Sequence, residues 1–255
     1  MPSLWKNKFE IKPGYWVFEP SEECRVIGNE LKNIILGKWQ PPDYYFHFQY
    51  GGHVAAAKSH FGNIFFLKLD LSKFFYSINR SRITRNLKEF FEYSTARDYA
   101  KSSTVRDPNN KYKFFLPYGY VQSLCLASLA LSKSQLGTEL NKIRKNNGCT
   151  ISVYVDDLII SSNNIELLYK IKDVVIDSAK KSKFLINENK TEGPSTLITA
   201  FNFDISYNSV KINETRFYEL LENHKKSDLM TQKEGIEGYV RSVDLNQYQF
   251  FMSLI

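Results

Sequence analysis

Three aspartates occupy places where structure alone does not call for a carboxylate. Asp70 interrupts a short apolar run, residues 63–73, which is typical of a strand buried on both faces. Asp156 and Asp157 are adjacent like charges between two β-rich runs, and residues 151–160 predict a hairpin with both aspartates at its tip. A carboxylate inside a buried strand is costly unless a cation meets it.

A pair of aspartates between two strands is, by itself, more often a polar turn than a catalytic element. With Asp70 on a neighbouring strand, however, the three carboxylates would repel one another unless divalent cations lay between them. Two Mg²⁺ ions, about 3.5–4 Å apart and held by shared carboxylates, are an arrangement used for phosphoryl transfer. Oxygen ligands suit Mg²⁺, which keeps coordination positions for substrate phosphates. The pattern predicts a site for two Mg²⁺ ions, with Mn²⁺ able to substitute.

A folded chain with several helices and strands must position these aspartates. Hydrophobic residues make up 43% of the 255 residues and aromatic residues 15%, which excludes a disordered or fibrous chain. Apolar periodicity predicts strands in the alternating segment 195–212 and helices in the C-terminal forty-odd residues. The other helices are expected at residues 22–36, 81–93, 121–147 and 164–183.

The balance of charge indicates a polyanionic partner. Lys and Arg outnumber Asp and Glu by 34 to 27, giving a net charge of +7 and a pI near 9.1. Three widely spaced cysteines, with no signal-peptide pattern at the start, predict a cytoplasmic protein. The uncharged stretch 114–132 contains Pro117, Gly119 and Gln122, so no membrane partner is expected. The four histidines lack the spacing of a zinc site.

The order of five motifs resembles that of reverse transcriptases. Residues 154–157, Tyr-Val-Asp-Asp, resemble the YxDD motif, here YVDD, and residues 67–75 resemble the first catalytic strand, with an aromatic five residues after the aspartate. The other three segments are 116–123, similar to LPxGxxxS, then 187–191, and 199–204 at the place of the primer-grip hairpin.

This resemblance implies an α+β, right-hand polymerase fold with fingers, palm and thumb. The palm would be a split βαβ unit, an antiparallel sheet with helices on one face. Fingers would span residues 1–66, with 80–115 as a second fingers segment, and the palm with its catalytic aspartates would span 67–79 and 116–205. Residues 206–255 would form a short helical thumb.

The resemblance also implies roles for single residues. Asp70, Asp156 and Asp157 would be the catalytic metal ligands, with the Leu71 carbonyl as an additional ligand, and Lys190 would donate a proton to pyrophosphate. Nucleotide-binding residues would be Phe75 as the aromatic that excludes a 2′-hydroxyl, with Phe74 as the alternative, and Tyr118, Gly119, Gln122 and Arg25. Many family members have Gln where this chain has Tyr118, which puts ordinary nucleotide selection in doubt.

Basic residues and two partial motifs suggest the partners. The nucleic-acid-binding residues would be Arg82, Arg85, Lys142, Arg144, Lys225 and Lys226, although each also suits a solvated helix face. Residues 56–60 and 198–200 are similar to retron signatures, which places the chain near retron-like, abortive-infection and defence-associated reverse transcriptases.

The motifs and the charge leave three hypotheses for the function of this protein. The first is an RNA-directed DNA polymerase, a nucleotidyltransferase that adds dNTPs to a 3′-hydroxyl by two-metal catalysis on a dedicated non-coding RNA in antiphage defence. The second is template-independent or protein-primed DNA synthesis, and the third is a catalytically idle RNA-binding palm protein. Expected partners are an RNA template, a DNA product or primer and dNTPs, with a homo-oligomer or a companion defence protein.

Overall fold

The computed structural model describes residues 4–145 and 148–255, and it divides into two compact units. The first unit comprises Met1–Asp43, Leu71–Asn141 and Val175–Ile186, and the second comprises Tyr44–Asp70, Lys142–Val174 and Asn187–Ile255. Each unit is described by itself below. In the described part of the chain, no helix has both the length and the apolar character that crossing a membrane requires.

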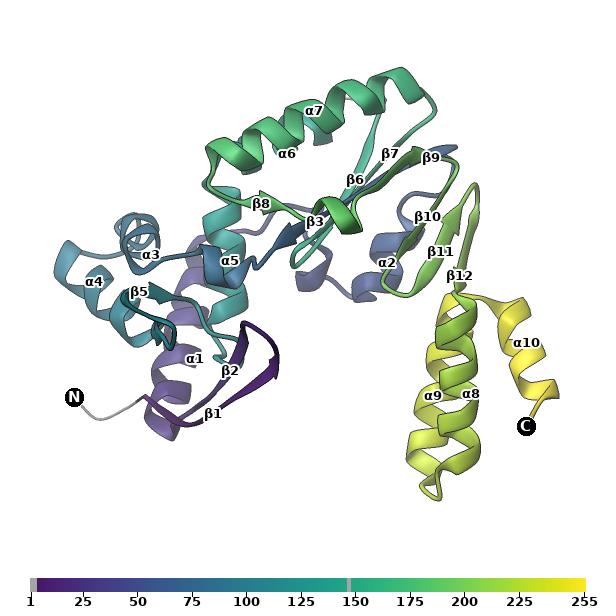
Figure 1. Cartoon of the computed structure of the whole chain (residues 1–255), viewed down its shortest axis with the longest axis horizontal. Helices are drawn as coiled ribbons and strands as arrows, with labels where there is room; N and C mark the ends of the chain where they lie inside the picture. Colours follow the sequence, from purple (N-terminus) through teal and green to yellow (C-terminus); the bar gives the residue numbers. More distant parts are fainter. Residues whose placement is uncertain (1–3, 146–147) are drawn as a thin grey trace. The chain divides into compact units, whose positions relative to one another are not determined.

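The first unit begins with a hairpin and a capped helix. Strands β1 (Trp5–Lys12) and β2 (Tyr15–Pro20) pair antiparallel and lead to α1 (Glu22–Lys38) (Figure 1). The hydroxyl of Ser21 accepts the Cys24 backbone N–H at 3.2 Å, and two glutamates in the first turn complement the helix dipole. The later elements of this unit are α3 (Arg80–Leu87), α4 (Tyr93–Ser102), β4 (Val105–Asp107), β5 (Asn110–Phe115), α5 (Ser123–Ser132) and β8 (Leu185–Ile186).

The expected helix over residues 121–147 is wrong in its extent. The structure has α5 followed by a separate helix, α6 (Gln135–Arg144), and residues 146–147 lie outside the described part. The break is stabilised locally because the hydroxyl of Ser134 accepts the Gly137 backbone N–H at 3.1 Å. A Cβ on Gly137 would lie 2.3 Å from the Leu131 carbonyl oxygen, so only glycine permits this close turn.

The expected helix over residues 81–93 is also wrong at both ends. Asn79 caps α3 by accepting the Arg82 backbone N–H at 2.9 Å, so the cap lies two residues before the expected start of the helix at residue 81. The helix then ends at Leu87, and a separate helix, α4, begins at Tyr93, where the expected helix was to end.

Strand β3 (Phe65–Ser72) is the buried strand that the sequence predicts. Within the second unit it pairs antiparallel with β7 (Asp157–Ser162) and with β9 (Glu192–Ser195). Strand β6 (Thr150–Tyr154) pairs on the other edge of β7, which confirms the predicted hairpin. The last residues of β3 belong to the first unit, where they pair with β8.

Short elements surround this sheet in sequence. Two short helices, η1 (Phe46–Phe48) and α2 (Gly52–Lys58), precede β3. Helix α7 (Ile165–Lys181) follows β7, and η3 (Glu188–Lys190) precedes β9. The remaining short helix, η2 (Phe75–Ser77), belongs to the first unit.

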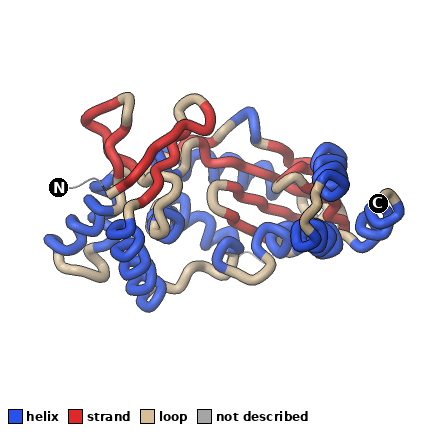
Figure 2. The backbone as a smooth tube through the Cα atoms, turned by 90° about the horizontal axis from the view of Figure 1, so that it is seen from below, coloured by secondary structure: helices blue, strands red, loops and turns tan. Residues whose placement is uncertain are grey.

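The rest of the second unit is a three-stranded meander followed by helices. Strands β10 (Leu197–Ala200), β11 (Phe203–Ser206) and β12 (Ser209–Ile212) confirm the predicted alternation. Phe201 and Asn202, with φ of 58° and 63°, form the turn between β10 and β11, as in hairpins of the type I′ class. After β12 the chain is drawn only as helix and loop (Figure 2).

The C-terminal helices confirm the last helical prediction. They are α8 (Glu214–Lys226), α9 (Met230–Val243) and α10 (Leu245–Ser253). Their buried residues share one hydrophobic core with the meander, which includes Phe203, Ile205, Phe217, Val240 and Phe251. The boundaries of fingers, palm and thumb remain predictions, because the two units divide the chain differently and place residues 44–66 with the second unit.

Candidate active site

The register of β3 against β7 brings two of the three aspartates together. Asp70 and Asp157 are paired residues on these antiparallel strands, and Asp157 also pairs with Tyr154 across the hairpin. Paired residues on antiparallel strands present their side chains on the same face. The expectation that both aspartates form the hairpin tip is therefore wrong by one residue: Val155 and Asp156 make the turn, and Asp157 begins β7.

The turn before Asp157 is strained and is held by a histidine. Val155 has φ of 61°, an uncommon conformation for a β-branched residue. Its backbone N–H donates to Nδ1 of His47 at 3.1 Å. Burial lowers the pKa of His47 to about 4, so the ring is neutral at pH 7 and Nδ1 can accept this bond. Sequence reasoning tested the histidines only as zinc ligands and missed this role of His47.

The environment of Asp157 disfavours its charged form. Burial and, to a smaller extent, the nearby negative charges of Asp156 and Asp70 together raise its pKa to about 6, while Lys68 and Lys190 oppose the shift. A carboxylate with a raised pKa beside two others is a place where a bound cation would relieve repulsion.

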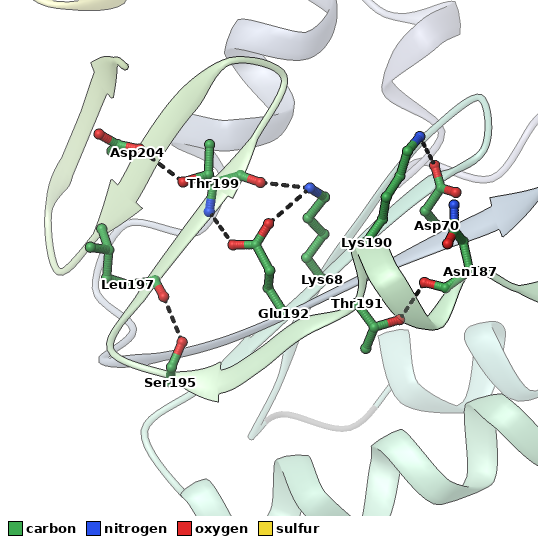
Figure 3. A network of polar contacts seen from close by, with 10 residues as sticks. All are labelled: Lys68, Asp70, Asn187, Lys190, Thr191, Glu192, Ser195, Leu197, Thr199 and Asp204. Carbon is green, nitrogen blue, oxygen red and sulfur yellow. Dashed lines mark hydrogen bonds and ion pairs between the residues drawn. The ribbon is translucent and has the colours of Figure 1, made fainter. Parts of the chain in front are cut away.

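Lys190 supplies a positive charge to this cluster (Figure 3). Its Nζ lies 3.0 Å from Oδ2 of Asp70, whose side chain is only 6% exposed. The hydrogen bond to Asp70 raises the pKa of Lys190, although burial acts in the opposite direction. The backbone N–H of Asn187 donates to the Asp70 carbonyl oxygen at 2.9 Å, which ties the segment that contains Lys190 to the catalytic strand.

A second lysine, which lies on β3 together with Asp70, was missed by sequence reasoning. Lys68 lies two residues before Asp70, and its Nζ lies 3.1 Å from Oε1 of Glu192 and donates to the Thr199 carbonyl oxygen at 2.6 Å (Figure 3). The other oxygen of Glu192 accepts the Thr199 backbone N–H at 2.7 Å. This network links β3 to β9 and β10. The signal in the sequence was a lysine inside an apolar strand, at even spacing from the aspartate.

The carboxylates of Asp70 and Asp157 suit a divalent cation that takes only some of its ligands from the protein. Among residues 4–145 and 148–255, no three His, Cys, Asp or Glu side chains converge closely enough to enclose an ion. Asp70 and Asp157 nevertheless face each other with oxygen donors alone. Mg²⁺ is commonly bound through one or two carboxylates plus substrate phosphates and water, so this pair fits the ion. Leu71 is the first residue of β3 that belongs to the first unit, and it pairs with Ile186 of β8. Its role as a carbonyl ligand of the metal remains a proposal.

The predicted nucleotide-binding aromatics lie in the first unit. Phe74 is 1% exposed and packs against Phe184 with ring centroids 5.6 Å apart. Phe75 is 8% exposed, and its ring centroid lies 4.9 Å from that of Tyr118. Of the two phenylalanines that the sequence left open, Phe75 is therefore the less enclosed by protein.

Two residues predicted beside the nucleotide pack closely within the first unit, and their nucleotide role stays a prediction. Gly119 has φ of 100°, and a Cβ there would lie 2.5 Å from the carbonyl oxygen of Phe18. Gln122 is fully buried, and its amide donates from Nε2 to the Ser103 hydroxyl at 3.3 Å. It also lies against Gly28 of α1, where a Cβ would meet Oε1 at 2.2 Å. No part of Gln122 is exposed to solvent.

The predicted basic residues differ in their surroundings. Arg82 is partly buried, donates from its guanidinium to the Ser182 carbonyl oxygen and lies 4.7 Å above the Phe184 ring, which is a structural role within the first unit. Lys226 pairs with Glu222 at 2.9 Å on an exposed helix face. The remaining members of the predicted set are exposed on helices: Arg25, Arg85, Lys142, Arg144 and Lys225.

Two further histidines stabilise the second unit. His60 is 1% exposed and contacts the hydroxyls of Ser161 at 2.7 Å and Ser152 at 2.8 Å, so it bridges β6 and β7. His224 of α8 lies 2.7 Å from a Glu237 oxygen on α9. These contacts explain both histidines without a metal ion.

Comparison with known proteins defines the class. The profile of the reverse transcriptase (RNA-dependent DNA polymerase) family matches residues 20–233. The chain belongs to this family, which confirms the predicted enzyme class, a nucleotidyltransferase of the RNA-directed DNA polymerase type.

Two kinds of relative refine this assignment. Over 247 residues the chain is 24% identical to the Retron Ec86 reverse transcriptase of Escherichia coli, covering 94% of this chain and 75% of the relative. This similarity confirms a retron-like bacterial reverse transcriptase as the resemblance suggested. Among solved structures, the fold is similar to a telomerase from Candida albicans in complex with a fragment of telomeric RNA, with a TM-score of 0.53, 10% identity and 91% of this chain covered.

A second solved structure has the same fold. A foamy viral protease-reverse transcriptase in complex with double-stranded DNA matches with a TM-score of 0.50 and 15% identity over 91% of this chain. The chain spans only 47% and 34% of the lengths of these two solved chains. The predicted α+β, right-hand polymerase fold is confirmed.

Proposed function

We propose that this protein adds dNTPs to a 3′-hydroxyl on an RNA template, with Asp70, Asp156 and Asp157 as catalytic metal ligands. The observation that carries the proposal is the pairing of Asp70 with Asp157 across β3 and β7, beside a turn that contains Asp156. Two bound Mg²⁺ ions, or Mn²⁺ in their place, would lower the pKa of the attacking hydroxyl and stabilise the leaving pyrophosphate.

The protein's own groups prepare this site. Lys190 balances the charge of Asp70 and is placed to give a proton to the leaving group, because its raised pKa keeps the ammonium protonated at pH 7. Lys68 adds positive charge near Asp157 while it is anchored by Glu192. His47 holds the turn that carries Asp156 by accepting the backbone N–H of Val155.

The defence setting is a finer part of the proposal. The partial retron signatures at residues 56–60 and 198–200, together with the relative named as a retron reverse transcriptase, support a dedicated non-coding RNA template. The proposal includes a cytoplasmic role in antiphage defence, with the protein acting alone, as a homo-oligomer or with a companion protein, as the resemblance to defence-associated reverse transcriptases implies.

Exchange of the aspartates tests catalysis. The double variant Asp156→Asn, Asp157→Asn should lose dNTP addition in a primer-extension assay while it retains folding and RNA binding. A matched control removes the same two charges at exposed positions of α7 and of the loop after α8, as Asp173→Asn and Asp228→Asn. Undiminished extension by the active-site variant would overturn the metal assignment. Absence of extension by the wild-type protein, with RNA binding intact, would favour the RNA-binding alternative.

Protein-primed or template-independent synthesis is the second candidate. It is favoured by Tyr118, which contacts Phe75 where many family members have Gln. Product DNA that partitions with protein during phenol extraction until a protease is added would support it, whereas protein-free product templated by added RNA would exclude it.

A further inference from the structure

A basic cavity in the first unit is not part of the catalytic cluster. It has a volume of about 650 Å³ and lies among residues of η2, the start of α3, β5 and the segment around β8. A cavity of this size accommodates a nucleotide-sized ligand. Its lining includes Lys73, Tyr76, Arg80, Tyr112, Lys113 and Lys183.

The charged side chains that line this cavity in the described chain are all positive. Lys73, Arg80, Lys113 and Lys183 line it, and no described lining residue is acidic. Within the described chain, none of these four cations forms an ion pair with a carboxylate. The carboxylate near them, Asp107, is only 3% exposed and already accepts the Tyr76 hydroxyl and the Asn109 backbone N–H.

Aromatic rings hold two of these cations, Arg80 and Lys113, in place. The Arg80 guanidinium lies 3.7 Å from the centroid of the Phe114 ring, and Nε donates to the Thr104 hydroxyl at 2.8 Å. The ammonium of Lys113 lies 3.3 Å from the centroid of the Tyr76 ring. Burial lowers the pKa of Lys113, the charge of Asp107 opposes this shift, and the positive charge of Lys73 acts in the same direction as burial. Positive charges that are fixed and mutually repelling favour a bound anion.

Two of the lysines stand at positions that suit a smaller residue. Lys73 has φ of 50° and Lys183 has φ of 58°, the left-handed region that glycine or asparagine adopts at lower cost. Both lysines nevertheless line the cavity in spite of this backbone strain. Tyr112, which also lines the cavity, is 83% exposed and offers an aromatic face to a base.

We propose that this cavity binds a nucleotide unit of an unpaired nucleic-acid strand, with phosphates on the four cations and a base stacked on Tyr112. Base stacking on an exposed aromatic and a cationic track along the backbone are the two features by which proteins hold single strands. The inference rests on the proposed function, because that function supplies the strand. The same chemistry would accept a free nucleotide, which the test distinguishes.

Anisotropy of a labelled single-stranded oligouridylate, without Mg²⁺ or dNTPs, measures the binding. The triple variant Lys73→Gln, Lys113→Gln, Lys183→Gln should bind more weakly, and the slope of log affinity against log salt should become shallower by about 2. The charge-matched control Lys38→Gln, Lys88→Gln, Lys180→Gln removes exposed lysines of the same unit outside the cavity and should leave that slope unchanged. Thermal unfolding of each variant checks that the fold is retained.

A second pair of variants tests the stacking. Tyr112→Ala should weaken binding about tenfold, whereas Tyr93→Ala, also exposed and outside the cavity, should not. Competition by free UTP and dATP at matched phosphate concentration shows the source of the ligand: displacement of the strand would assign the cavity to a free nucleotide. Equal salt slopes for the triple variant and its control, with no effect of Tyr112→Ala, would overturn the proposal.

The outcome is independent of catalysis. Both sets of variants are measured again in the Asp156→Asn, Asp157→Asn background, in which the cavity is intact. If the wild-type protein fails to add dNTPs but the triple variant still loses strand binding, the proposed function fails and the cavity assignment holds. The reverse pattern, full polymerisation with no loss of strand binding, rejects the cavity assignment alone.

Discussion

The ammonium of Lys190 lies 3.0 Å from Oδ2 of Asp70, so the buried carboxylate of the catalytic strand has a cation of its own. Because Asn187 binds the Asp70 backbone as well, the segment of η3 is fixed both to the main chain and to the side chain of this residue. Lys190 can therefore act as a counter-ion of the Asp70 carboxylate, or as an acid that protonates the leaving group.

Replacement of Lys190 separates these two roles. If the lysine donates a proton, Lys190→Met should lower kcat about a hundredfold at saturating Mg²⁺, and Lys190→Arg should not restore it, because a guanidinium does not give up its proton. If the lysine is only a counter-ion, kcat should be kept while the Mg²⁺ concentration needed for half-maximal rate falls in Lys190→Met. We expect the first result, measured as kcat in a single-nucleotide addition assay across a Mg²⁺ titration.

Phe75 is expected to discriminate against ribonucleotides. Its removal in Phe75→Ala should raise the ratio of kcat/KM for a ribonucleotide to that for the matching dNTP, because the space beside the sugar opens. Phe74→Ala, at a position that is 1% exposed, should instead destabilise the fold by about 3–5 kcal/mol. An unchanged ratio in Phe75→Ala would assign discrimination to another residue.

His47 is expected to position the YVDD turn without touching substrate. Loss of the bond to the Val155 N–H in His47→Ala leaves a strained turn without its support, and kcat should fall roughly tenfold while KM for dNTP changes little. His47→Asn, which can still offer an acceptor, should recover part of the rate. A variant with full kcat and only lowered thermal stability would show that the contact is structural alone.

The sequence predicted the parts of this protein whose signals are local. The buried strand with Asp70 and the hairpin of residues 151–160 follow from apolar runs, and the family follows from motif order. The helix over 121–147 was too long because apolar periodicity continues through Ser134, and only the close packing around Gly137 requires the break.

The rest of the site depends on contacts between distant residues. Gln122 was assigned to a nucleotide because of its motif, yet its burial against Gly28 is set by the fold of α1 and α5. His47 lies 108 positions from its partner Val155, so no spacing rule could have linked them. Lys68 left a faint signal, a charge inside a buried strand, whose meaning required its partner Glu192.

His60 should make the protein sensitive to acid. Burial lowers its pKa to about 3, whereas an unfolded histidine has a pKa of about 6.5. The folded state therefore binds fewer protons than the unfolded state between these values, and the stabilisation that is present above pH 6.5 is lost as the pH falls toward 3. Between pH 7 and pH 5, one such group lowers the free energy of unfolding by about 2 kcal/mol. His60→Asn lacks this group, so its free energy of unfolding should decrease less over that range, although it should be lower than that of the wild type at pH 7.

Urea unfolding of both proteins at pH 7 and pH 5 gives the comparison. Since His47 and His53 also have lowered pKa values and remain in both proteins, their contribution cancels in the difference. Equal losses of stability in the wild type and in His60→Asn would mean that the imidazole is already protonated between Ser152 and Ser161, with both ring N–H groups donating to the serine hydroxyl oxygens. A larger loss in the wild type than in His60→Asn would instead establish a neutral His60, accepting a hydrogen bond at one ring nitrogen and donating at the other, as the link between β6 and β7.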